Sequence, residues 1–129
     1  MLIDTDIIVW YMRGDANAYD VIDNQRGFFI SVITYIELVQ GMRNKHELLS
    51  LRNALRRWNT RIIYVTEDIS AKAMFLVEQH YLSHSLQLAD ALIAATAVST
   101  GLPILTGNDK HYRAIGELTV KKFKPSRPK

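Results

Sequence analysis

The sequence predicts a three-layer α/β/α sandwich with a central, mostly parallel sheet of five strands. Short β-rich apolar runs alternate with longer segments of helical periodicity, which is typical of βαβ units whose parallel sheet is covered on both faces. The chain has 129 residues, of which 48% are hydrophobic, enough for one buried core. It contains no repeat, low-complexity run or evident linker. We therefore expect a single domain over residues 1–124 and a basic tail over 125–129.

The first 24 residues predict one strand and two short helices. Met1–Asp4 opens with three apolar residues and predicts a short buried strand. Ile7–Arg13 predicts a short helix that Gly14 stops, and Asn17–Asn24 predicts a second helix. The chain therefore begins with a strand followed by two short helices.

The middle of the chain repeats the strand and helix alternation. Phe28–Val32 is an uninterrupted apolar stretch and predicts a buried strand. Thr34–Met42 predicts a helix whose first residue is the N-cap, because Glu37 follows it at the spacing of a capping box. His46–Trp58 has leucines near helical period, and Ile62–Val65 is a β-branched strand.

The last third completes the pattern. Asp68–Tyr81 predicts an amphipathic helix, and Leu86–Thr100 predicts an apolar helix that Ser85 caps and a glycine ends. Pro103–Thr106 and Leu118–Phe123 predict the fourth and fifth strands. In open parallel sheets the functional crevice lies beyond the carboxyl ends of the strands.

Four acidic residues lie where apolar segments end or begin. Asp4 and Asp109 follow expected strands, whereas Glu37 and Asp90 lie in the first turns of expected helices. If they converge on one crevice, their charges repel, by roughly 1 kcal/mol at 4 Å in water and about 4 kcal/mol at an effective dielectric near 20. A hard divalent cation with oxygen ligands, Mg²⁺ or Mn²⁺, removes that penalty. The pattern therefore favours a metal site.

Each acid also has a structural explanation. Asp90 can stabilise a helix start, and Glu37 can be the return half of a capping box. Asp6 follows the first strand by a few residues, so we expect it to cap the helix beginning near Ile7, with a supporting role in the acidic pocket as the alternative. The remaining acids lie in polar contexts, where solvation explains them.

Charge and composition limit the classes of function. The formal net charge is +3, which is mild support for a polyanionic partner. The cationic residues near the C-terminus either form a solvated end or contact RNA phosphates or a protein partner. The chain has no cysteine, no signal-like N-terminus and no apolar stretch of membrane-spanning length. We expect a cytoplasmic protein without a membrane partner.

Four segments resemble the motifs of PIN-domain proteins over nearly the whole chain. These segments are Ile3–Tyr11, Ser31–Leu38, Leu88–Ala97 and Leu105–Tyr112. In length and compactness the chain is similar to the VapC-type toxins of type II toxin–antitoxin pairs. The resemblance implies a PIN-like α/β/α fold and a Mg²⁺- or Mn²⁺-dependent endoribonuclease, usually a homodimer, that a small antitoxin inhibits.

The resemblance also implies site residues. Asp4 and Asp90 would bind the metal directly, and Glu37 with a residue of the fourth motif would complete the catalytic set. In that motif the family's acid or amide falls on Asn108, whereas charge favours the next residue, Asp109, as metal ligand and catalytic residue. The family usually has an amide at the position of Asp6, which we place with Thr5 and Thr106 among the supporting residues. The alternative function is a non-catalytic PIN-like module for RNA binding or assembly.

A histidine pair offers a separate metal-site hypothesis. His80 and His84 have the i, i+4 spacing of a helical metal-binding pair. Because the helix is expected to end near Tyr81, the two rings need not share a face. A metal role is therefore not expected for this pair.

Overall fold

A computed structural model describes residues 1–25 and 27–126. Five strands form one sheet in the order β3-β2-β1-β4-β5, and every neighbouring pair is parallel. The strands are β1 (Leu2–Ile3), β2 (Phe29–Ser31), β3 (Arg61–Ile63), β4 (Ile104–Thr106) and β5 (Val120–Lys122). The predicted α/β fold with a central five-stranded parallel sheet is confirmed.

The sheet separates two hydrophobic clusters. In β1, Leu2 belongs to one cluster and Ile3 to the other, and both are fully buried. The same alternation occurs in β4, where Ile104 and Leu105 belong to opposite clusters. Because successive side chains of a strand point to opposite faces, these short strands read as continuous apolar runs.

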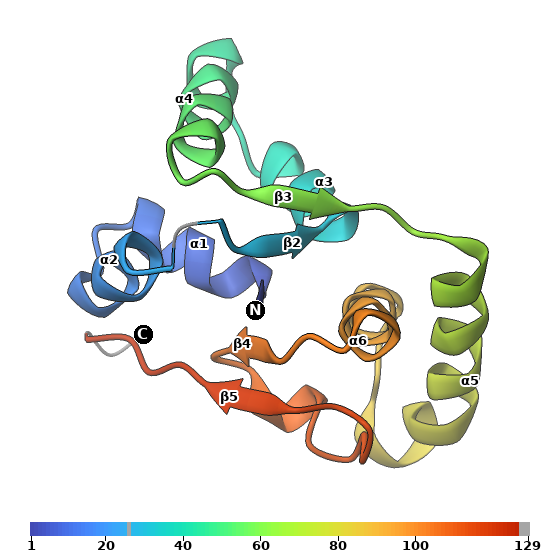
Figure 1. Ribbon diagram of the computed structural model, residues 1–129. Helices are drawn as coiled ribbons and strands as arrows, with labels where there is room; N and C mark the ends of the chain where they lie inside the picture. The colour runs from blue at the N-terminus through green and yellow to red at the C-terminus, as the bar shows by residue number, and fades with distance from the viewer. Residues whose placement is uncertain (26, 127–129) are drawn as a thin grey trace.

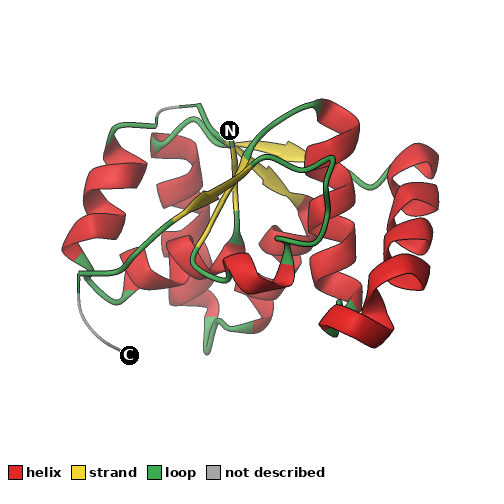
Figure 2. Ribbon diagram, turned by 90° about the horizontal axis from the view of Figure 1, so that it is seen from below, coloured by secondary structure: helices red, strands yellow, loops and turns green. Residues whose placement is uncertain are grey.

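Helices cover both faces of the sheet, and Figure 1 shows α1 and α2 on one side and α5 and α6 on the other. Figure 2 shows the strands between these groups of helices. The helices are α1 (Thr5–Met12), α2 (Ala16–Asp23), α3 (Val32–Gln40), α4 (Lys45–Arg57), α5 (Glu67–His84), α6 (Leu88–Thr100) and the 3₁₀ turn η1 (Asp109–His111). The described helices include none that is long and apolar enough to cross a membrane.

Helices begin directly where strands end. Asp4 is the N-cap of α1, and its carboxylate accepts the N–H of Thr5. The expectation that Asp6 caps a helix beginning near Ile7 was therefore wrong, because α1 starts two residues earlier. Ser31 likewise ends β2 and caps α3 through the N–H of Ile33.

The predicted capping box of α3 was also wrong. Thr34 lies inside the helix, is fully buried, and has its hydroxyl oxygen 3.0 Å from that of Thr5. Glu37 therefore does not serve as the return half of a capping box and instead receives a hydrogen bond from Thr5. The chain enters α3 so early because Ser31 supplies the capping oxygen at the end of the strand.

The fifth helix is longer than expected. It continues through His84 and ends at Ser85, a C-cap residue in the left-handed conformation with φ 52°. The prediction that Ser85 caps the next helix was wrong, because α6 begins at Leu88 and its N-cap, Gln87, makes no side-chain capping bond. His80 therefore shares one helix with His84, and their ring centroids are 5.9 Å apart.

The C-terminal segment is held against α2. The backbone N–H and the hydroxyl of Ser126 both donate to the buried carboxylate of Asp15, at 2.8 and 2.6 Å. Asn17 also donates to the carbonyl of Lys124 at 3.0 Å. Of the expected basic tail over 125–129, residues 127–129 lie outside the described residues.

Candidate functional site

A cavity of about 410 Å³ lies at the carboxyl end of the central strands. Residues from α1, α3 and α6 contribute to its wall, together with residues of the segment that follows β4. Its polar lining residues are Asp4, Thr5, Asp6, Arg13, Glu37, Asp90, Asn108 and His111. Three of the four acids singled out in the sequence therefore line one cavity, as does Asn108.

Asp4 is held by three hydrogen bonds. Its Oδ1 accepts the N–H of Thr5 at 2.8 Å, and its Oδ2 accepts the hydroxyls of Thr106 at 2.7 Å and Tyr112 at 3.2 Å. A carboxylate has about four lone-pair sites, so the remaining acceptor capacity is on Oδ1. The carboxylate is thus fixed in orientation while one oxygen keeps capacity for a further ligand.

Burial dominates the electrostatics of Asp4. Only 5% of this residue is exposed. Burial raises its pKa, the hydrogen bonds from Thr106, Thr5 and Tyr112 oppose that shift, and the negative charge of Asp90 raises the pKa further. Without a compensating cation, the charged form of Asp4 is therefore costly.

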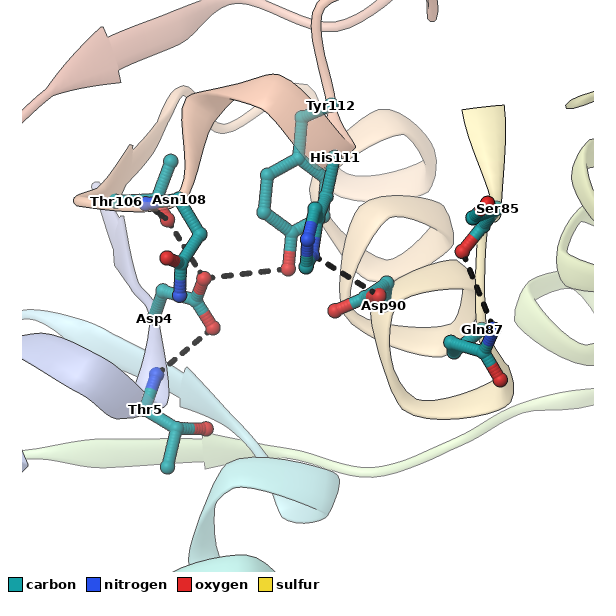
Figure 3. A network of polar contacts seen from close by, with 9 residues as sticks. All are labelled: Asp4, Thr5, Ser85, Gln87, Asp90, Thr106, Asn108, His111 and Tyr112. Carbon is teal, nitrogen blue, oxygen red and sulfur yellow. Dashed lines mark hydrogen bonds and ion pairs between the residues drawn. The ribbon is translucent and has the colours of Figure 1, made fainter. Parts of the chain in front are cut away.

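Asp90 lies in the first turn of α6, opposite Asp4. Its Oδ2 is 3.2 Å from Nδ1 of His111, a residue of η1. Figure 3 shows His111 and Tyr112 between Asp4 and Asp90, so the loop after β4 links the two carboxylates. Sequence reasoning did not pair His111 with Asp90.

Glu37 reaches the cavity from α3. The hydroxyl of Thr5 donates to its Oε1 at 2.7 Å. Because the Thr5 hydroxyl also lies 3.0 Å from that of the buried Thr34, a hydroxyl pair supports one oxygen of Glu37. Its other oxygen, Oε2, is available to the cavity.

Asp6 packs against the turn after β4. Its Oδ2 accepts the N–H of Gly107 at 2.9 Å, whereas its buried Oδ1 has no hydrogen-bond partner. Burial, together with the charge of Asp4, raises the pKa of Asp6 to about 6. A Cβ at position 107 would lie 2.5 Å from Asp6 Oδ2, so any larger residue there would displace the Asp6 carboxylate.

The structure separates the two candidates of the fourth motif. Asn108 is exposed and lines the cavity. Asp109 is buried and makes an ion pair with Arg113, and its Oδ1 lies 3.7 Å from Nζ of Lys122. Burial alone would raise the pKa of Asp109, but these two cations outweigh it and lower the pKa. Asp109, expected as a metal ligand, is therefore engaged by the protein's own cations outside the cavity lining.

Two residues at the site were missed by sequence reasoning. Tyr112 is the last residue of the fourth motif segment, but nothing in the sequence pairs it with Asp4. Gly107 was not identified as a site residue. A glycine directly after a strand was the available signal, because it marks a possible close backbone approach. Thr106 and Thr5, expected as supporting residues, do contact Asp4 and Glu37.

The donors that face the cavity are chiefly carboxylate and amide oxygens, the ligands that Mg²⁺ and Mn²⁺ prefer. Asp6 supplies an unsatisfied buried oxygen, and three further carboxylates, Asp4, Glu37 and Asp90, line the same cavity. Over residues 1–25 and 27–126, no three histidine, cysteine, aspartate or glutamate side chains are arranged so that they could hold one metal ion. The chemistry of the donors fits a hard cation.

Comparison with known proteins places this site in context. The model of the PIN domain family matches residues 1–118. The chain is 32% identical over 124 residues to ribonuclease VapC19 of Mycobacterium tuberculosis, covering 91% of this chain and 95% of that protein.

Solved structures share the fold. A toxin–antitoxin complex from Klebsiella pneumoniae contains a chain with a TM-score of 0.76 and 28% identity, covering 95% of this chain and 98% of that one. VapBC2 from Rickettsia felis, bound to a DNA fragment from its promoter, gives a TM-score of 0.78 at 20% identity, with coverage of 95% and 98%. The second likeness supports the fold alone.

Proposed function

Because the chain belongs to the PIN-domain family, we propose that it is a Mg²⁺- or Mn²⁺-dependent endoribonuclease that hydrolyses RNA phosphodiesters. One observation carries the proposal: Asp4, Glu37 and Asp90, which come from three separate elements, line a single cavity. The related chain from Mycobacterium tuberculosis is named a ribonuclease, which supports the same activity here.

Asp4 and Asp90 are the proposed metal ligands, with Asn108 in place of Asp109 as the nearby member from the fourth motif. The mutual repulsion of Asp4 and Asp90 and the unsatisfied oxygen of Asp6 both favour a cation in the cavity. A bound Mg²⁺ or Mn²⁺ supplies charge stabilisation to the phosphate and lowers the pKa of a coordinated water.

The chain's own residues position these groups. Thr106 and Tyr112 hold Asp4, and His111 contacts Asp90, so the loop after β4 orients both carboxylates. Glu37 is fixed through Oε1 by Thr5. Its Oε2 is then the candidate to accept a hydrogen bond from the attacking water and to orient that water toward phosphorus.

We further propose that the protein is a toxin inhibited by a small antitoxin. Support comes from the structural neighbour of 28% identity, which is a toxin–antitoxin complex. We also propose a homodimer. Exposed apolar side chains of α5 and α6 support this, since exposed apolar surface often marks an interface. Met74 and Leu88 line one groove between these helices, and Phe75 and Leu82 are further exposed apolar residues of α5.

The direct test is RNA cleavage by purified protein with added Mg²⁺ or Mn²⁺. Asp4→Asn and Asp90→Asn should each lower the rate by at least about 100-fold, because several kcal/mol of charge stabilisation depend on the ion. Asp68→Asn is the matched control, since Asp68 is an exposed carboxylate of α5 outside the cavity. Both site variants should keep the circular dichroism spectrum of the wild type.

Two further measurements separate the alternatives. Induced expression of the wild type, but not of Asp4→Asn, should arrest growth and leave cut RNA in the cells. Mn²⁺ titration should show binding that Asp4→Asn weakens, whereas a non-catalytic RNA-binding module need not bind the ion. Unchanged cleavage in both Asp4→Asn and Asp90→Asn would refute the assignment of the site.

A further inference from the structure

Two histidines meet on the last two turns of α5. His80 and His84 have ring centroids 5.9 Å apart and an interplanar angle of 74°. His84 is exposed and His80 is partly exposed. Neither is among the described residues that line the carboxylate cavity. We propose that this histidine pair binds a divalent transition-metal ion of the zinc, nickel and copper class, at a second site separate from that cavity.

The spacing of the rings fits a shared ion. Two imidazoles bound to one tetrahedral metal, with metal–nitrogen distances of about 2.1 Å, have ring centres roughly 5–6 Å apart. The observed separation of 5.9 Å lies in that range without a change of backbone. Imidazole nitrogens suit zinc, nickel and copper, whereas Mg²⁺ prefers oxygen, so the two proposed sites select different metals.

A neighbouring hydroxyl orients one of the ligands. The hydroxyl of Ser83 donates to the carbonyl of His80 at 3.4 Å and lies 2.6 Å from Nδ1 of His84. In the tautomer with the proton on Nδ1, His84 donates to the Ser83 oxygen, and the Ser83 hydroxyl donates to that carbonyl. This is the tautomer that the proposed site uses, because it leaves the lone pair of His84 on Nε2. Histidines that bind metals in proteins usually donate their other ring N–H in this way.

The chain on either side of the pair carries no cationic residue close in sequence. The chain from Ala73 to Asp109 contains no lysine or arginine. His84 is also the last residue of α5, where the carbonyl ends of the helix favour positive charge. A metal held by residues one turn apart would fasten the end of α5 just before the connection to α6.

Zinc titration of the full-length protein tests the proposal, with calorimetry in excess Mg²⁺ as the readout. The wild type should bind one more Zn²⁺ per chain than the variant with both His80→Ala and His84→Ala. The variant His46→Ala is the matched control, because His46 is an exposed histidine of α4, and it should keep the wild-type stoichiometry. Ser83→Ala should weaken binding by roughly 10-fold, as expected for loss of an outer partner of a ligand.

A second readout needs no variant. Substoichiometric Cu²⁺ should broaden the imidazole proton resonances of His80 and His84 before those of His46. Equal zinc stoichiometry in the wild type and the double variant, or equal broadening of all three histidines, would overturn the proposal and leave the ring contact as packing. RNA cleavage in Mg²⁺ should be the same in the double variant, so this test is independent of the proposed nuclease activity.

Discussion

The hydroxyl of Tyr112 donates a hydrogen bond of 3.2 Å to Oδ2 of Asp4, across 108 positions of the sequence. Only 1% of Tyr112 is exposed, and burial together with the charges of Asp4 and Asp90 raises the pKa of its phenol. The tyrosine therefore stays protonated and acts as a permanent donor to Asp4. With Thr106, it fixes which carboxylate oxygen faces the cavity.

Replacing this donor should weaken metal binding without unfolding the protein. In Tyr112→Phe, Asp4 loses one of two hydrogen bonds to Oδ2 and gains freedom to rotate, so we expect a loss of about 10-fold or more in Mn²⁺ affinity. Calorimetric titration with Mn²⁺ measures this change directly. Tyr64→Phe is the control, because Tyr64 is 67% exposed and should bind Mn²⁺ as the wild type does. Equal affinities in the two variants would remove Tyr112 from the site.

Asp6 should make the metal-free protein less stable as the pH rises. Its pKa of about 6 in the folded state exceeds the ordinary value of 3.8, so the folded state binds more protons than the unfolded state between these values. The free energy of unfolding therefore falls as the pH rises from about 4 to 6, by at most about 3 kcal/mol from this group.

Asp6→Asn removes that dependence. Urea unfolding in the presence of a metal chelator should give a larger free energy of unfolding for the variant than for the wild type at pH 7. At pH 4 the two free energies should be nearly equal, because the protonated carboxyl and the amide are both uncharged. A stability difference that is the same at both pH values would contradict the role of the Asp6 charge.

Gly107→Ala should destabilise the protein through a contact with Asp6. The added methyl would lie 2.5 Å from Asp6 Oδ2 and 3.5 Å from the carbonyl of Phe123, so the carboxylate must move and lose its bond to the backbone N–H. We expect a cost of about 1–3 kcal/mol in urea unfolding. Gly116→Ala is the matched control, because nothing lies within 4 Å of its added methyl.

A double variant isolates that contact. If the clash with Asp6 causes the loss, combining Gly107→Ala with Asp6→Ala should cost clearly less than the sum of the two single changes. Additive costs would mean that the methyl disturbs the turn after β4 by another route.

Asn108 and Asp109 should have separable effects. Asn108→Ala should lower RNA cleavage and leave the melting temperature close to that of the wild type, because Asn108 is exposed and lines the cavity. Asp109→Asn should lower the melting temperature, because Arg113 and Lys122 lose their carboxylate partner. Cleavage at 20 °C and thermal melting, measured on both variants, decide the assignment. The reverse pattern would restore Asp109 to the site.

The fold could be predicted because its signals are local. The central strands β1, β2 and β4 lie within short apolar runs, and burial on both faces of the sheet explains why these runs do not alternate with polar residues. The edge strands β3 and β5 are more exposed and carry Arg61, Lys121 and Lys122. The helix starts were less predictable. Asp4 and Ser31 each end a strand and cap the following helix, so the first helical residue comes earlier than the polar residues at Asp6 and Thr34 suggest.

The gathering of acids could be anticipated, but the side chains that orient them could not. Asp4 follows β1 and Asp90 lies in the first turn of α6, and parallel topology brings such ends to one edge. Glu37 lies further along its helix than the sequence suggested, because α3 begins at Val32. The choice between Asn108 and Asp109 depends on where each side chain points in η1, which adjacent positions in a sequence do not reveal. The contacts of Tyr112 with Asp4 and of His111 with Asp90 likewise depend on the path of the loop after β4.

The central place of β1 has a consequence for biosynthesis. The Thr106 hydroxyl that binds Asp4 belongs to a residue added 102 positions later. At synthesis rates of roughly 5–20 residues per second, the growing chain carries Asp4 for about 5–20 s before that partner is made. During that interval the nascent polypeptide has no complete carboxylate cavity. An inhibitor made in the same cell can therefore be present before the site is assembled.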